Sequence, residues 1–254
     1  MKKNKKKKVR RRLKIKPFLT LMTIIVLIAL SGYYLYHLQI KNIYISGNNF
    51  LSDHEIIMAA NIKDYPRMFK YSGKILEKKI EKLDLVKSVK ISKSLFGKLT
   101  IKVEEAIPLF YNRNSSNYVL SNGKTTNDYS FAGVPFLINY VPENIYKRLI
   151  LELSNVQFNS IQMVSEIEYS PSKSGEIVID DTRFLFRMND GNEVYINLIN
   201  IDRLDSYPLI YTILTEKGVL ELDSDNESVV FKSYKSIEEA KTREESENGD
   251  ESEE

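Results

Sequence analysis

The sequence of 254 residues contains no cysteine and only two histidines. Without cysteine the chain has no disulfide, no thiolate metal site and no site for lipoprotein attachment. Such a composition suits a protein that works outside the cytoplasm, because its fold does not depend on an oxidising environment. The absence of cysteine does not identify the compartment by itself, and no cofactor is expected.

The motifs of common enzyme active sites are also missing. His54-Glu55 lacks the second histidine of a zinc-protease motif, because Met58 stands at that position, and no phosphate-binding loop or nucleophile elbow occurs. The adjacent carboxylates Glu104-Glu105 and Asp180-Asp181 lie on extended or turn segments, where neighbouring side chains point apart. We interpret both pairs as solvated. The sequence therefore predicts a protein that is not an enzyme and has no small-molecule substrate.

Acidic residues are absent from the N-terminal arm. Residues 2–16 contain eleven of the 37 lysines and arginines, which leaves 26 basic residues against 34 acidic ones in the rest of the chain. Basic arms can bind nucleic acid, but this arm directly precedes an apolar run, where Lys and Arg set the orientation of a membrane helix and contact lipid headgroups. We expect residues 1–17 to be a cytoplasmic arm with Lys14 and Lys16 at the membrane interface, and no nucleic-acid partner.

Residues 18–38 contain no charged residue apart from His37, which is normally neutral. An apolar run of about 20 residues is what a helix needs to cross the hydrocarbon core of a bilayer. Tyr33, Tyr34 and Tyr36 are typical of the aromatic belt at the outer interface. The sequence predicts a single-pass type II membrane protein of the cell membrane, with a cytoplasmic N-terminus and an extracellular C-terminus.

A cleaved signal peptide is the alternative, because Ala29-Leu30-Ser31 before Gly32 fits the small-x-small pattern of a cleavage site. The apolar run continues beyond this point to Leu38, and the tyrosines favour a retained anchor. The same small residues could instead mark a contact with another membrane helix.

Residues 40–106 predict a small α+β domain with the element order of a POTRA module. A short strand is closed by the turn Gly47-Asn48-Asn49, and Ser52 to Glu55 has the spacing of a capping box before a helix. The expected elements are a strand at 43–45, helices at 56–61 and 75–83, and strands at 89–91 and 99–103.

Residues 107–231 predict a mixed, strand-rich β domain with two helices. Asn189-Asp190-Gly191-Asn192 is a strong hairpin signal, and Pro208 is expected to bend the last helix. The expected helices are 143–159 and 201–214, and the expected strands lie at 109–111, 118–120, 136–138, 164–169, 177–179, 184–188, 193–197 and 219–223. The last segment, 232–254, is polar and acidic, so we expect a disordered tail.

The order of these motifs resembles the FtsQ/DivIB family of bacterial cell-division proteins. The motifs in the first domain are I-x-x-I-x-I-S-G-N at Ile40–Asn48, L-S-x-x-E-I at Leu51–Ile56 and LVKSVKISKSLFGKLTIKVEE at Leu85–Glu105. Those in the second are Y-V-L-S-N-G-K at Tyr118–Lys124, S-E-I-E-Y-S-P at Ser165–Pro171, M-N-D-G at Met188–Gly191, D-R-L-x-x-Y-P at Asp202–Pro208 and G-V-L-E-L-D at Gly218–Asp223.

The resemblance implies a scaffold that is found at the division septum and binds other polypeptides. The implied partners are single-pass division proteins of the DivIC/FtsB and FtsL types, with a septal peptidoglycan synthase as a further partner and the lipid bilayer around the anchor. An exposed strand edge can accept a strand from another chain, and the resemblance implies such an edge after Gly218. The implied partner-binding residues are Val219, Leu220, Glu221, Leu222 and Asp223, together with Arg203 and Tyr207 from the preceding helix.

Period-two alternation places Leu220 and Leu222 on the inner side of this strand and Val219, Glu221 and Asp223 on the outer side. Two other functions remain open at this point. One is assistance to polypeptide export by a POTRA protein, and the other is a membrane-anchored cell-wall hydrolase.

Overall fold

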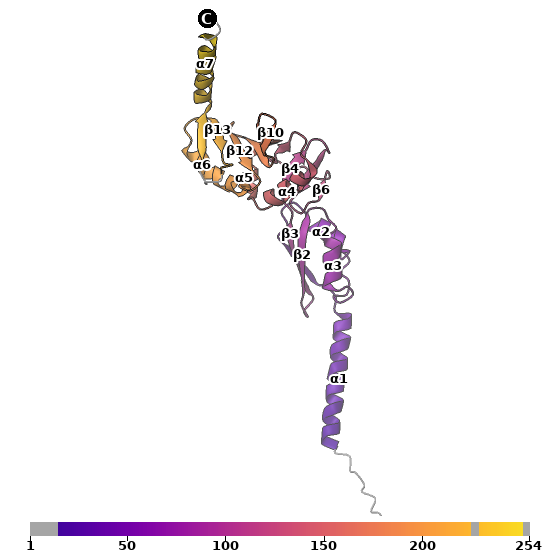
Figure 1. Ribbon diagram of the computed structural model, residues 1–254. Coiled ribbons are helices and arrows are strands. Elements are labelled where there is room, and N and C mark those ends of the chain that lie inside the picture. Colours follow the sequence, from indigo (N-terminus) through magenta and orange to yellow (C-terminus); the bar gives the residue numbers. More distant parts are fainter. Residues whose placement is uncertain (1–14, 225–228, 251–254) are drawn as a thin grey trace, which may run out of the picture. The chain divides into compact units, whose positions relative to one another are not determined.

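The computed structural model describes residues 15–224 and 229–250, with the backbone alone for 244–250. The chain divides into two compact units (Figure 1). The first comprises Met1–Asn48, Ser52–Ile80 and Val89–Val103, and the second comprises Asn49–Leu51, Glu81–Ser88 and Glu104–Glu254.

The chain begins with a long apolar helix, α1, at Ile15–His37. It has 23 residues, contains an 18-residue stretch with a mean hydropathy of 2.1 and has no buried residue, which makes it a candidate membrane span. At 1.5 Å per residue it measures about 35 Å, enough to cross a hydrocarbon core of about 30 Å. The helix starts earlier than the apolar run that begins at Phe18, because Ile15, Lys16 and Pro17 form its first turn.

The first unit has the predicted order of strand, two helices and two strands. Its three-stranded sheet has the order β1-β3-β2, with β1 parallel to β3. One side of each helix supplies buried side chains, among them Ile56, Ala60, Leu76 and Ile80, which join Leu99 and Ile101 of β3 in the core. The elements are β1 Asn42–Ser46, α2 Asp53–Ala60, α3 Gly73–Ile80, β2 Val86–Lys93 and β3 Lys98–Glu105.

The structure contains the capping box and the glycine turn that predicted this unit. The Ser52 side chain accepts a hydrogen bond from the Glu55 backbone N–H, and the Glu55 carboxylate accepts one from the Ser52 N–H, which completes the capping box. Gly47 has a φ of +87°, and a Cβ there would lie 2.1 Å from the Val103 carbonyl oxygen. The turn after β1 therefore requires glycine.

The prediction that the Glu105 carboxylate is solvated is wrong, because the carboxylate accepts three backbone hydrogen bonds. Its Oε2 accepts hydrogen bonds of 2.8 Å from the backbone N–H groups of Asn49 and Phe50, and its Oε1 accepts one of 2.8 Å from Leu51. Hydrogen bonds to a charged acceptor are stronger than those between neutral groups. Glu105 thus fixes this loop, whereas its neighbour Glu104 forms an exposed ion pair of 2.9 Å with Lys87.

The second unit is built on a nine-stranded mixed sheet. The strand order is β14-β13-β12-β11-β8-β7-β4-β5-β6, with parallel pairs at β12–β13, β4–β7 and β7–β8. The strands are β4 Pro108–Asn112, β5 Asn117–Leu120, β6 Thr125–Thr126, β7 Phe136–Leu137, β8 Val164–Tyr169, β11 Arg183–Met188, β12 Glu193–Asn197, β13 Gly218–Glu221 and β14 Val230–Ser233.

Helices pack against this sheet and complete one hydrophobic core. Ile145 and Leu149 of α4, Ile161 of α5 and Leu204 of η1 are buried in the same cluster as Phe184 of β11. Each of the two helices expected from the sequence is split in two. The observed pieces are α4 Glu143–Leu153 and α5 Phe158–Ile161, then the 3₁₀ helix η1 Ile201–Ser206 and α6 Tyr207–Ile213. Pro208 lies in the first turn of α6, where proline is tolerated, rather than at a bend inside a helix.

Two segments depart further from the sequence prediction. The expected strand 177–179 is β10 Ile177–Asp180, but it pairs with β9 Ser172–Ser174 in a separate two-stranded ribbon instead of joining the large sheet. Residues 234–250 form a helix, α7 Tyr234–Asp250, where a disordered tail was expected. Residues 235–243 include two Lys, two Glu, one Ala and one Arg, which favour helix locally, and residues 234–243 contribute no buried side chain.

Candidate functional site

The strand that the sequence places at the sheet edge is covered in the structure. β13 lies parallel to β12 on one side and antiparallel to β14 on the other. Among the described residues β14 is therefore the outermost strand at this end of the sheet. The expectation of a free edge at β13 is wrong, because Val230–Ser233 returns to pair with it across a loop that local patterning does not reveal.

The alternation predicted along β13 and the residues after it agrees with the structure. Leu220 and Leu222 are fully buried in the core of the second unit. Val219, Glu221 and Asp223 are partly exposed. Glu221 Oε1 accepts a hydrogen bond of 3.0 Å from Lys232 Nζ on β14, so its side chain ties the two strands together.

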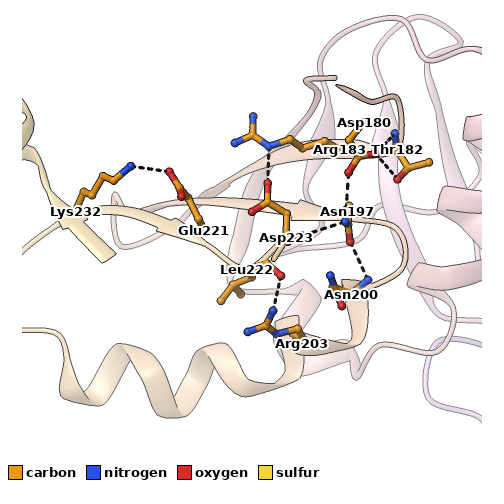
Figure 2. A network of polar contacts seen from close by, with 10 residues as sticks. All are labelled: Asp180, Thr182, Arg183, Asn197, Asn200, Arg203, Glu221, Leu222, Asp223 and Lys232. Atoms are coloured by element: carbon orange, nitrogen blue, oxygen red, sulfur yellow. Dashed lines mark hydrogen bonds and ion pairs between the residues drawn. The ribbon is translucent and has the colours of Figure 1, made fainter. Parts of the chain in front are cut away.

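Asp223 is held by a polar network at the end of β13 (Figure 2). Its Oδ2 accepts a hydrogen bond of 2.6 Å from Arg183 Nε, and both side chains are about four-fifths buried. The Asp223 carbonyl oxygen accepts a bond of 3.3 Å from Asn197 Nδ2, which also donates to Asp180 Oδ2 at 3.3 Å. Asp180 in turn accepts two bonds of 2.7 Å from the backbone N–H and hydroxyl of Thr182, so it is not a solvated carboxylate.

Arg203 holds the same segment from the helical side. Its Nη1 donates to the Leu222 carbonyl oxygen at 2.7 Å (Figure 2). The same nitrogen donates to the Ser224 carbonyl oxygen at 3.4 Å. Arg203 belongs to η1, so these bonds connect the 3₁₀ helix to the strand end. The structure therefore brings Arg203 and the end of β13 together and gives Arg203 a role in positioning the strand, whereas the partner binding that the resemblance implied for these residues stays a prediction.

Tyr207 lies in the interior of the second unit. It is fully buried, and its hydroxyl donates a hydrogen bond of 2.6 Å to Asp190 Oδ2 and accepts one of 3.1 Å from Asn192 Nδ2. Burial, followed by the hydrogen bond to Asp190, raises the pKa of the Tyr207 phenol, so the hydroxyl is protonated at neutral pH. Asn192 Oδ1 also accepts a bond of 2.8 Å from the Gly218 N–H. Tyr207 thus supports β13 from inside and does not lie on the surface.

The free edge of β14 can be assigned from its hydrogen-bond pattern. The Tyr234 N–H donates to the Lys217 carbonyl at 3.1 Å, and Gly218 lies opposite Ser233. Bonded and non-bonded pairs alternate along an antiparallel ladder. The backbone N–H and C=O groups of Phe231 and Ser233 therefore point away from β13.

Exposed apolar side chains gather beside this edge. A hollow of about 420 Å³ lies beside η1, α6 and Val229, and its lining is mixed, with Asn200, Asp202 and Arg203 next to Ile210 and Val229. Exposed apolar residues occur on α6, on β14 and on the segments just before η1 and β14, namely Ile199, Leu209, Tyr211, Ile213, Val229 and Val230. Clusters of this kind mark protein-interaction surfaces.

The predicted membrane-interface residues are on or before α1. Tyr33, Tyr34 and Tyr36 are exposed near its C-terminal end, and Lys16 is exposed in its first turn. Lys14 lies outside the described residues. His37 ends α1 and His54 lies in the first turn of α2, and no group of three His, Asp or Glu residues that could hold a metal occurs within the described ranges.

Comparison with known proteins assigns the chain to a family. The model of the POTRA domain, FtsQ-type, matches residues 38–106, close to the boundaries expected from the sequence. Cell division protein DivIB of Bacillus subtilis (strain 168) is 32% identical over 197 residues, which cover 73% of this chain and 72% of that protein. The chain belongs to the DivIB family.

Other DivIB proteins are similar over comparable lengths. DivIB of Bacillus anthracis is 28% identical over 226 residues, which cover 86% of this chain and 83% of that protein. The solved major extracytoplasmic domain of the trans isomer of DivIB from Geobacillus stearothermophilus is 23% identical, covers 44% of this chain and 95% of its own, and has a TM-score of 0.35. A likeness at that score supports no conclusion about this DivIB chain.

Sequence reasoning missed several residues that hold the β13–β14 edge. Arg183 and Asn192 lie on β11 and next to β12, and their partners are 40 and 26 residues away along the chain. β14 pairs with β13 because the chain reverses direction between them, and no local motif in this DivIB sequence predicts that pairing. The signal that could have identified Arg183 and Asn192 is a polar side chain inside an otherwise apolar strand or turn.

Proposed function

We propose that this chain is a scaffold of the bacterial divisome that has no enzymatic activity of its own and binds other division proteins at the β14 edge. Membership of the DivIB family carries the proposal, since the relatives at 28–32% identity are named cell division proteins. The FtsQ-type POTRA domain directly after a candidate membrane helix supports it.

The proposed topology is single-pass and type II. Ten basic residues at positions 2–14 precede α1 and Lys16 lies in its first turn, whereas the following part of the chain is acidic in balance. Positive charge on the cytoplasmic flank favours an N-terminus inside the cell. The POTRA domain and the β domain would then lie outside the cytoplasmic membrane, and the protein would gather at the septum.

Partner binding is proposed at β14 by strand addition. The outward N–H and C=O groups of Phe231 and the outward N–H of Ser233 offer hydrogen bonds to an incoming strand, which supply affinity, whereas the Ser233 carbonyl oxygen already accepts a bond of 2.8 Å from the Ser236 hydroxyl. The neighbouring apolar side chains, Leu209 and Ile213 of α6 and Val230 of β14, would select the partner. The β13 residues that the resemblance implied as partner-binding would then support this surface without forming it, because they hold in place the strand with which β14 pairs.

The proposed partners are single-pass division proteins of the DivIC/FtsB and FtsL types. An extended extracytoplasmic segment of such a protein could add to one sheet edge. Contact with the septal peptidoglycan synthase would then follow through these partners. No observation on the described part of the chain favours an export function or a cell-wall hydrolase.

A fluorescent fusion of the full chain tests the division function. We expect the signal to concentrate at midcell during septation, and depletion of the protein to cause filamentation or failed septation. A uniform membrane signal throughout the cell cycle, or depletion that impairs export while septa still form, would contradict the proposal. Time-lapse microscopy of growing cells makes both measurements.

A further inference from the structure

Two loops of the first unit are bonded to the few residues that follow α1. The Lys41 N–H donates to the Gly97 carbonyl at 2.8 Å, in the turn between β2 and β3. The Met68 N–H donates to the Leu38 carbonyl at 2.7 Å, in the loop between α2 and α3. Because α1 ends at His37, the residues that bond the two loops, Leu38 and Lys41, follow the end of the helix by one and four residues.

These loops present apolar and cationic side chains to the surroundings. Phe96 is 82% exposed and Leu95 is 56% exposed, although both are large apolar residues. The turn that carries them is ordered by backbone bonds, since the Gly97 N–H donates to the Ser94 carbonyl at 3.3 Å. We define the membrane-proximal collar as Tyr65, Arg67, Phe69, Lys70, Leu95 and Phe96, all exposed.

The collar lies level with the C-terminal end of α1. The Tyr34 hydroxyl, one turn before the end of α1, donates a hydrogen bond of 3.0 Å to the Leu95 carbonyl. Tyr34 belongs to the last turn of α1 itself, and the interfacial layer on each side of the hydrocarbon core is about 5–7 Å thick. If α1 crosses the bilayer, the turn at Leu95-Phe96 reaches this layer.

The composition of the collar fits that layer. Aromatic rings are enriched at membrane interfaces, and Arg and Lys contact lipid phosphates while their apolar stems remain in the boundary region. The Arg67 guanidinium lies 4.5 Å above the ring of Tyr36 on α1, which joins the collar to the aromatic belt of the helix. Burial of an exposed Phe side chain yields about 1.5–3 kcal/mol.

The geometry points to a lipid-binding site: the collar inserts Leu95 and Phe96 into the interfacial layer of the leaflet next to the end of α1. Phe69 and Tyr65 flank the insertion, and Arg67 and Lys70 contact headgroup phosphates. The contact restricts the tilt of the first unit relative to the bilayer. This inference rests on α1 crossing a membrane and does not depend on the partners proposed for β14.

The sequence allows a direct test because it contains no tryptophan. A Phe96→Trp variant of the full chain, reconstituted in phospholipid nanodiscs, reports on one site alone. His54→Trp is the matched control, since His54 is exposed in the first turn of α2. The chain leaves α1, runs along β1 from Asn42 to Ser46 and reaches α2 only after that, so His54 follows the end of β1 that is farther from α1. Quenching is measured with lipids brominated near the headgroup end of the acyl chain and, separately, with acrylamide in the water.

We expect brominated lipids to remove most of the Phe96→Trp fluorescence and acrylamide to remove little of it, with the reverse for His54→Trp. Quenching of Phe96→Trp by acrylamide but not by brominated lipid would overturn the proposal, because the side chain would then lie in water. Protection of Phe96→Trp from both quenchers would also overturn it, since a protein surface would then cover the turn.

Discussion

Replacing Gly218 with alanine is expected to force β14 away from β13 and to lower the free energy of unfolding by about 3 kcal/mol, a cost typical of severe overpacking. A Cβ at position 218 would lie 2.2 Å from the Lys232 carbonyl oxygen and 2.8 Å from the Ser233 Cα. Both atoms belong to the backbone, so neither can swing aside as a flexible side chain would. Urea denaturation followed by circular dichroism measures the loss.

Gly73→Ala is the control for this substitution. Gly73 opens α3, and the nearest atom to a Cβ there is 3.9 Å away. Alanine favours helix over glycine by up to about 1 kcal/mol, so this variant should be as stable as the wild type or slightly more stable. Equal unfolding curves for Gly218→Ala and the wild type would contradict the assignment of β14 as the strand that covers β13.

Shortening Tyr207 to alanine is expected to lower the free energy of unfolding by about 3–5 kcal/mol, and Tyr207→Phe by about 1–3 kcal/mol. The alanine variant loses a fully buried aromatic ring, whereas the phenylalanine variant loses only the hydroxyl that bonds Asp190 and Asn192. The two bonding partners would remain buried or half-buried without this hydroxyl, which accounts for the second cost. Urea denaturation of the two variants separates the ring from the hydroxyl.

The same variants distinguish a structural role for Tyr207 from direct partner contact. A buried side chain cannot touch a partner, so Tyr207→Phe should still capture division proteins at temperatures where it is folded. A Tyr207→Phe protein that unfolds like the wild type but loses partner capture would show that the side chain is accessible. That result would favour the surface role implied by the sequence motifs.

Local signals in the sequence were sufficient for most of the first unit. The capping box at Ser52 and Glu55, the turn at Gly47 and the alternation before and after Gly97 each act within a few residues. Such interactions are encoded in short stretches, so the order of strands and helices in the POTRA domain could be derived from them. The structure differs mainly where partners are distant in sequence.

Distant partners explain what could not be derived. Glu105 bonds the backbone at Asn49–Leu51, more than 50 residues away, and nothing near Glu105 indicates an acceptor role. Likewise, β14 covers β13 only because the chain turns back to pair with it. Tyr207 is buried because it packs in the core of the second unit, which residues distant in sequence form. The alternation of Leu220 and Leu222 with their neighbours was predictable, but the position of that strand within the sheet was not.

The most direct test of the proposed scaffold is partner capture by a Ser233→Pro variant of the full chain, co-purified from membranes with the proposed DivIC-like and FtsL-like partners. The Ser233 N–H points away from β13, so proline removes an outward donor and blocks an incoming strand without breaking a β13–β14 bond. Ser233→Ala is the control, because both variants lose the hydroxyl that accepts a bond from the Ser236 N–H.

We expect Ser233→Pro to lower capture at least about fivefold, since one net backbone hydrogen bond contributes about 1 kcal/mol and the ring adds a steric block. Ser233→Ala should capture the partners like the wild type, and both variants should show the circular dichroism of the wild-type fold. Undiminished capture of both partners by a folded Ser233→Pro protein would contradict strand addition at β14.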